Sequence, residues 1–116
     1  MHALFIELPA FQRHRQDYLD DAAFRQLQVW LLQNPEVGDV IQGTGGLRKA
    51  RFSDEARSKG KRGGLRLIYY WWAGGSQFWL FTVYDKSDQA DLSAHHRKAL
   101  KGRLEAEIHA RKVDET

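Results

Sequence analysis

The sequence predicts an α+β domain in which a small antiparallel sheet carries helices. Two segments rich in aromatic and β-branched residues, 65–72 and 78–86, flank the turn AGGSQ and indicate a β-hairpin. Two other segments place apolar residues at helical spacing, which indicates amphipathic helices. The chain has 116 residues, enough for one domain with a core and too few for two, so we expect a single domain over residues 1–116.

The N-terminal part is predicted to contain one strand and two helices. The segment ALFIEL (3–8) is predicted to be a short strand. A helix is expected over 9–19, because Pro9 fits the first turn of a helix and apolar residues follow at helical spacing. The clearest helix is DDAAFRQLQVWLLQNP, where Asp20 or Asp21 can cap the start and Pro35 ends it.

The C-terminal part is predicted to supply the rest of the sheet and a last helix. GDVIQGTGG contains turn residues, LRKARF is predicted to be a strand, and SDEARSKGKRGG is predicted to be a loop before the hairpin. The final segment gives a long amphipathic helix, capped by Asp91 or Ser93. The expected order of elements is β-α-α-β-β-β-α.

Strand parity suggests where charge lies on the sheet. Both faces of the first hairpin strand are apolar, so it should be central, yet Arg66 lies in it, and a charge there is costly unless it is paired or open to a ligand. Lys49 and Arg51 share one face of their strand, and Tyr84 and Lys86 share one face of theirs. Sequence alone leaves open which faces coincide. If they coincide, the basic residues form one cationic patch.

The charge of the chain is concentrated in one segment. Residues 48–66 hold eight Lys/Arg and two acidic residues, a net charge of +6, whereas the other residues hold ten Lys/Arg and thirteen Asp/Glu, a net charge of −3. This asymmetry favours a polyanionic partner, although a solvated charged loop would show the same pattern. Within the loop, basic residues alternate with glycine, which favours phosphate contact by Lys59, Lys61 and Arg62.

Several classes of protein are excluded or disfavoured. Cysteine is absent, which excludes disulfides and thiolate metal sites. Apolar runs are too short for a membrane span, and the start lacks the pattern of a signal peptide, so we expect a cytoplasmic protein. GTGGLRK does not match a phosphate-binding loop and precedes a strand. His95 and His96 are adjacent and lack the spacing of a metal pair, so neither metal nor cofactor is expected.

Three segments together resemble one protein family. GDVIQGTGGLRKARF, GKRGGLRLIYYW and FTVYDKSDQADLS, followed by a terminal helix, resemble the HigB-like branch of the RelE superfamily, the toxins of bacterial type II toxin–antitoxin pairs. The resemblance covers about residues 3–108. It implies a monomeric ribonuclease that enters the ribosomal A site and cuts messenger RNA. It also implies a helix-turn-helix antitoxin of the HigA type.

The resemblance also implies roles for individual residues. Arg66 corresponds to the family's catalytic arginine, Lys49 and Arg51 to its basic strand, and Lys86 to its basic residue after the last strand. The sequence departs from many such toxins at Asp85 and at Ser87, where they have a glycine and a second basic residue.

The expected chemistry is metal-independent cleavage by the RNA's own 2′-OH. Arg66 suits the charge that develops on the phosphate oxygens, because its planar fork matches phosphate. The proton-transfer group stays open among Lys59, Lys61, Lys86, Tyr84 and Asp85. The alternatives are a basic RNA- or ribosome-binding module without catalysis and a basic protein-docking surface.

Overall fold

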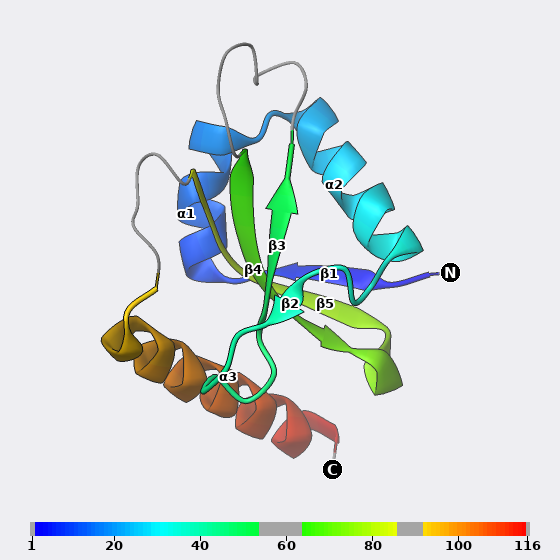
Figure 1. Ribbon diagram of the computed structural model, residues 1–116. Coiled ribbons are helices and arrows are strands. Elements are labelled where there is room, and N and C mark those ends of the chain that lie inside the picture. The colour runs from blue at the N-terminus through cyan, green and yellow to red at the C-terminus, as the bar shows by residue number, and fades with distance from the viewer. Residues whose placement is uncertain (1, 54–63, 86–91, 116) are drawn as a thin grey trace.

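The computed structural model describes residues 2–53, 64–85 and 92–115, and it confirms the α+β class and the expected order of the main elements (Figure 1). The order includes one additional strand, β2, which is two residues long. The helices and strands are β1 (Leu4–Glu7), α1 (Pro9–Tyr18), α2 (Asp21–Gln33), β2 (Asp39–Val40), β3 (Arg48–Phe52), β4 (Leu65–Trp72), β5 (Gln77–Asp85) and α3 (Ala94–Glu115).

The five strands form one sheet in the order β1-β5-β4-β3-β2. Strands β2 to β5 pair antiparallel, and β4 and β5 form the predicted hairpin with β4 in the centre of the sheet. Strand β1 differs from the expected antiparallel arrangement, because it pairs with β5 in parallel along Leu4–Glu7. Its hydrogen bonds at each end, from Leu4 N to Ser76 O and from Leu8 N to Leu80 O, are both 3.0 Å long.

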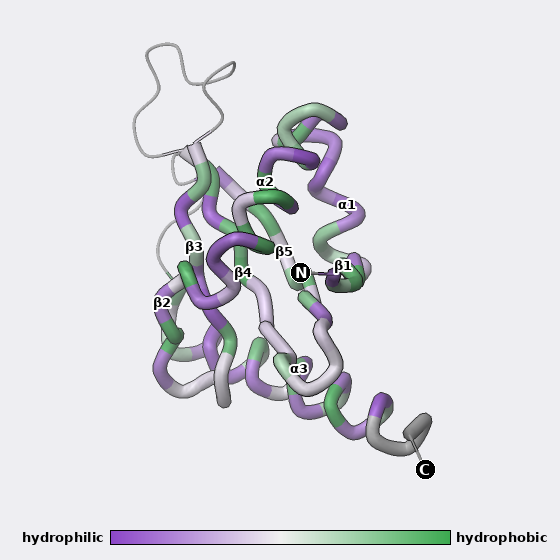
Figure 2. Tube along the Cα trace, turned by 90° about the vertical axis from the view of Figure 1, so that its right-hand side faces the viewer, coloured by the Kyte–Doolittle hydropathy of each residue, from purple (hydrophilic) through white to green (hydrophobic). Residues whose placement is uncertain are grey.

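Helices cover the two faces of the sheet separately. The α1–α2 face carries a core of apolar residues from both helices and from β3, β4 and β5, including Phe11, Leu27, Leu67 and Tyr69. The opposite face packs against α3. Figure 2 shows hydrophilic and hydrophobic segments alternating along α3, as expected for a helix with one side on a sheet. Among the residues described, no helix has both the length and the apolar content of a membrane span.

Local sequence signals fix the helix ends as predicted. Pro9 begins α1, and the Asp20 carboxylate accepts a hydrogen bond from Ala23 N at 2.7 Å at the start of α2. Helix α2 ends at Gln33, before the residue that precedes Pro35. Of the two caps predicted for α3, Ser93 accepts a hydrogen bond from the backbone of His96 at 3.2 Å, and Asp91 lies outside the described residues.

The glycine-rich segment before β3 is a structural turn, as predicted. Gly43, Gly45 and Gly46 have φ values of 83°, 85° and 127°, which residues other than glycine rarely adopt. The buried Thr44 hydroxyl donates to Ile41 O at 2.6 Å and accepts from the backbone of the residue that precedes β3. This turn leads the chain from β2 into β3.

Tyr69 fixes the connection between α2 and β2 from inside the core. Its hydroxyl donates to Pro35 O at 2.9 Å and accepts from Gly38 N at 3.0 Å. Burial raises the pKa of the Tyr69 phenol above its usual value, and the hydrogen bond from Gly38 opposes this rise. Tyr69 therefore has a structural role on the α1–α2 face.

Candidate functional site

The sheet register aligns candidate residues from three strands in one row. Arg66 in the central strand β4 pairs with Arg51 in β3 on one side and with Tyr84 in β5 on the other. Directly opposite residues in a sheet point to the same face, so the three side chains are neighbours. In the next row along that face, Lys49 pairs with Ile68. The faces whose alignment the sequence left open therefore coincide for Lys49, Arg51 and Arg66.

A β-bulge in β5 turns Tyr84 toward this face. The register shifts between Ile68 and Tyr69, so that Ile68 pairs with Thr82 and Tyr69 pairs with Leu80. Strict alternation would place Tyr84 on the same face as Leu80, which packs on the α1–α2 side. The extra residue moves Tyr84 to the α3 side, beside Arg66. Bulges are frequent next to active sites because they redirect side chains in this way.

Arg66 is a buried charge. Its relative exposure is 5%, and its guanidinium donates to Gly64 O at 3.4 Å, which is a long hydrogen bond. Gly64 has a φ of 58°, and a Cβ atom there would lie 2.7 Å from the backbone oxygen of Phe52. The chain therefore needs glycine immediately before β4. The neighbouring Arg51 is exposed, so the row extends from the surface to the interior.

Arg48 belongs to a different environment from the other basic residues of β3. It pairs with Tyr69 and so faces the α1–α2 side. Its guanidinium forms an ion pair with Glu36 at 3.1 Å and donates to Gly38 O at 2.8 Å. Arg48 thus stabilises the α2–β2 connection, and part of the basic segment identified in the sequence is structural.

Helix α3 brings further polar residues to the same face. Thr82, Tyr84, His96 and Arg103 border a hollow of about 160 Å³ between the sheet and the helix, together with four apolar residues. His96 is exposed, and its ring lies 6.3 Å from that of His95. This position of His96 could not be predicted, because neither histidine lies in the basic segment and the rotation of α3 against the sheet is set by tertiary packing.

The remaining predicted site residues either lie outside the described residues or point to the other face of the sheet. Lys86, Lys59, Lys61 and Arg62 lie outside the described residues. Asp85 pairs with Leu65, a residue of the α1–α2 core, and so points away from the face that carries Arg66. Within the described ranges, no group of three or more His, Asp or Glu side chains is arranged to hold a metal ion.

This arrangement can bind and polarise a phosphate without a metal. Two guanidinium groups lie next to one another on adjacent strands, and a lysine occupies the neighbouring row. A phenol and an imidazole border the hollow beside them, and both can transfer protons. Because a sheet holds its side chains more rigidly than a loop, the donors need little reorganisation when an anion binds.

Comparisons with known proteins identify the fold. No protein-family model matches the sequence. A double arginine-to-alanine mutant of the E. coli toxin RelE in the free state matches with a TM-score of 0.53 and 17% sequence identity, over 77% of this chain and 88% of that chain. The isolated E. coli RelE toxin matches with a TM-score of 0.50 and 18% identity, over 86% of this chain and 97% of that chain.

A toxin–antitoxin complex is also similar. The intact E. coli RelBE complex matches with a TM-score of 0.50 and 17% identity, over 71% of this chain and 94% of that chain. At such low identity the likeness concerns the path of the backbone and carries no residue roles. The protein therefore has a RelE-like fold.

Proposed function

We propose that the protein is the toxin of a bacterial type II toxin–antitoxin pair, of the HigB-like kind, and that it cuts messenger RNA on the ribosome. The observation that carries the proposal is the row formed by Arg51, Arg66 and Tyr84, which runs from an exposed arginine to a buried one. The RelE-like fold and the +6 segment support it.

The proposed chemistry requires only groups of this chain and of the RNA. The 2′-OH oxygen attacks the adjacent phosphorus and forms a new O–P bond, while the P–O5′ bond breaks. A base removes the 2′-OH proton, and an acid returns a proton to O5′, so the products are a 2′,3′-cyclic phosphate and a 5′-hydroxyl. Arg66 would stabilise the charge on the non-bridging oxygens, with Arg51 at the exposed end of the row as the first contact.

Tyr84 and His96 are the described groups best placed for the proton transfers. Both border the hollow next to Arg66, and a phenol and an imidazole each carry an exchangeable proton. Lys86, Lys59 and Lys61 remain proposals from the sequence, as does phosphate contact by Arg62. Because the ribosome can contribute further groups, cleavage is expected on translated messages in the A site.

We also propose an antitoxin partner of the helix-turn-helix, HigA type. An acidic segment laid over Lys49, Arg51 and Arg66 would neutralise the cationic row and exclude RNA from it. Co-expression of the protein with the product of the adjacent gene, followed by purification and mass spectrometry, tests for this partner. Recovery of the protein alone after such co-expression would contradict the proposal of a stable pair.

The decisive experiment compares Arg66 variants in bacteria under controlled expression. Arg66→Ala leaves space in a buried position, so Arg66→Met is the matched variant, because it keeps most of the volume and removes the charge together with the guanidinium's hydrogen-bond donors. Loss of one transition-state donor typically costs about 10²- to 10³-fold in rate. Wild-type protein should arrest growth and generate new 5′-hydroxyl ends on translated messages, whereas folded Arg66→Met protein should generate few.

Two outcomes would change the conclusion. If Arg66→Met protein, shown to be folded by thermal unfolding, cuts as well as wild type, the assignment of Arg66 is wrong. If wild-type protein arrests growth without new RNA ends, the alternative function applies, which is a basic RNA- or ribosome-binding module without catalysis.

A further inference from the structure

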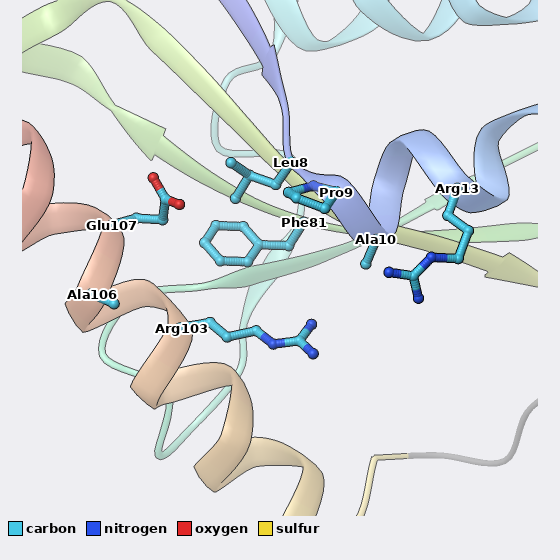
Figure 3. A pocket seen from close by; sticks show the side chains of 8 residues that line it. All are labelled: Leu8, Pro9, Ala10, Arg13, Phe81, Arg103, Ala106 and Glu107. Carbon is cyan, nitrogen blue, oxygen red and sulfur yellow. The ribbon is translucent and has the colours of Figure 1, made fainter.

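A second cavity lies on the α3 side of the sheet, away from the row that contains Arg66. It has a volume of about 320 Å³ and lies between the start of α1, the middle of β5 and the middle of α3. Its floor is apolar, and its charged residues are Arg13, Arg103 and Glu107 (Figure 3). This volume is at the lower end of the roughly 300 to 1,000 Å³ of typical small-ligand sites.

The side chains that line this cavity carry an excess of positive charge. In Figure 3 the side chains of Arg13 and Arg103 extend from α1 and α3 into the space between the helices. Glu107, the one carboxylate among the residues that line it, is already paired with Arg111 at 3.4 Å. Among the described residues, neither Arg13 nor Arg103 has a carboxylate within 4.0 Å, whereas Arg15, like Arg111, is ion-paired.

The cavity and the hollow beside Tyr84 lie along the same side of α3 and share one lining residue. Arg103 borders both the cavity and the hollow that contains Tyr84 and His96. With a rise of about 1.5 Å per residue, the side of α3 from His96 to Glu107 extends for roughly 16 Å. We call the hollow, the cavity and the side of α3 between them the cationic groove. Its exposed arginines are Arg103 and Arg13, and its other end holds Tyr84, the strand neighbour of Arg66.

We propose that this groove binds the single-stranded RNA that flanks the cleavage position, with Arg103 and Arg13 contacting successive phosphates. The proposal rests on the proposed function, which supplies RNA to the row at Arg66. Its chemistry fits a nucleotide chain: arginine forks match phosphate oxygens, and an apolar floor accepts the faces of sugars and bases. The same groove offers no pairing for a cationic segment, because Glu107 is occupied by Arg111.

The test measures binding of purified protein to a short fluorescent 2′-O-methyl RNA, which has no 2′-OH and cannot be cut. Each phosphate contact to a single strand contributes about 0.7 to the slope of log affinity against log salt concentration. Arg13→Ala and Arg103→Ala should each weaken binding and reduce the slope by about 0.7, and the double variant by about 1.4. Both arginine side chains are exposed, so the substitutions leave the core unchanged.

Arg25→Ala is the matched control. Arg25 is also an exposed helical arginine, but it lies on α2, on the opposite face of the sheet. Its removal should leave the affinity and the salt slope unchanged. An unchanged slope in the double variant of Arg13 and Arg103 overturns the proposal, and so does a wild-type protein that does not bind the RNA at low salt.

Three further outcomes are informative: the first identifies the class of partner, and the other two separate this inference from the proposed function. If oligoglutamate displaces the RNA as effectively as unlabelled RNA does, the groove is reassigned to an acidic protein segment. If the groove variants lose RNA binding while wild-type protein cuts no message in cells, the groove stands and the proposed nuclease function fails. If wild type cuts and the groove variants bind RNA normally, the nuclease stands and the groove fails.

Discussion

At the scale of single residues, the neighbours His95 and His96 differ in their expected role: His96 is a candidate for proton transfer, and His95 is a surface residue. His96 borders the hollow with Tyr84, whereas His95 does not. A general acid or base typically contributes about 10²- to 10⁴-fold to rate. We expect His96→Ala to lower the rate of message cleavage within that range and His95→Ala to leave it near wild type.

Chemical rescue with imidazole distinguishes a role of His96 in proton transfer from a structural role. Added imidazole should restore part of the cleavage by His96→Ala protein, because a free base can occupy the space that the side chain leaves. Equal activity of the His95 and His96 variants would remove His96 from the proton-transfer step. If imidazole does not restore the rate, His96 contributes to the packing of the site and not to proton transfer.

Tyr69 is expected to make the free energy of unfolding decrease at alkaline pH. Burial raises the pKa of the folded-state phenol above the roughly 10 of an exposed tyrosine, so the unfolded chain ionises first. The stabilisation is fully present below pH 10, and it is lost as pH rises from there through the folded-state pKa. Tyr69→Phe should unfold more easily at neutral pH, by about 1 to 3 kcal/mol for two lost hydrogen bonds, and should lose less stability above pH 10.

Denaturant unfolding at several pH values measures this effect. Tyr70→Phe is the control, because Tyr70 is the next residue of β4 and packs on the opposite face. An alkaline loss of stability that is the same in wild type and Tyr69→Phe would show that another group is responsible.

At the scale of elements, two glycines give opposite predictions for the same substitution. A Cβ atom at Gly64 would lie 2.7 Å from a backbone oxygen of β3, and the φ of 58° adds strain. A Cβ atom at Gly102, in the middle of α3, would meet nothing within 4 Å. Gly64→Ala should therefore lower the free energy of unfolding by at least about 1 kcal/mol, and Gly102→Ala should raise it by about 0.5 to 1 kcal/mol.

Thermal unfolding of both variants shows whether each substitution lowers or raises the stability as expected. Destabilisation by Gly102→Ala would contradict the open surroundings of that position. A Gly64→Ala protein as stable as wild type would mean that the start of β4 relaxes without cost.

The elements also show why sequence predicts the fold better than the site. Strand β4 was predicted with its observed bounds, because an aromatic and β-branched run between glycines has a strong local preference. Strand β2 was missed, since it is two residues long and exposed. The bulge opposite Ile68 has no local sequence signal, and without it strict alternation turns Tyr84 away from Arg66.

At the scale of the whole molecule, the three-layer arrangement divides the basic residues into two groups. Arg15 and Arg48 are ion-paired and stabilise connections around α1 and α2. Arg51 and Arg66 are neighbours on the α3 side, and Arg103 borders the hollow beside Tyr84 on the same side. The charge asymmetry was readable from the sequence, but this division depends on strand register and on the placement of α3, which are long-range contacts that periodicity does not encode.

The parallel pairing of β1 with β5 also has a consequence for the order in which the chain folds. Leu4 pairs with Gln77, so the first strand acquires its neighbour only after most of the chain has been synthesised. The β4–β5 hairpin closes over a short turn, but the β1–β5 edge has the entropic cost of a long loop and forms later. A nascent chain that has not reached β5 cannot complete the sheet, and the row through Arg66 and Tyr84 does not yet exist. If the protein is the toxin proposed above, the ribosome that makes it would be spared its activity until translation of the sheet is finished.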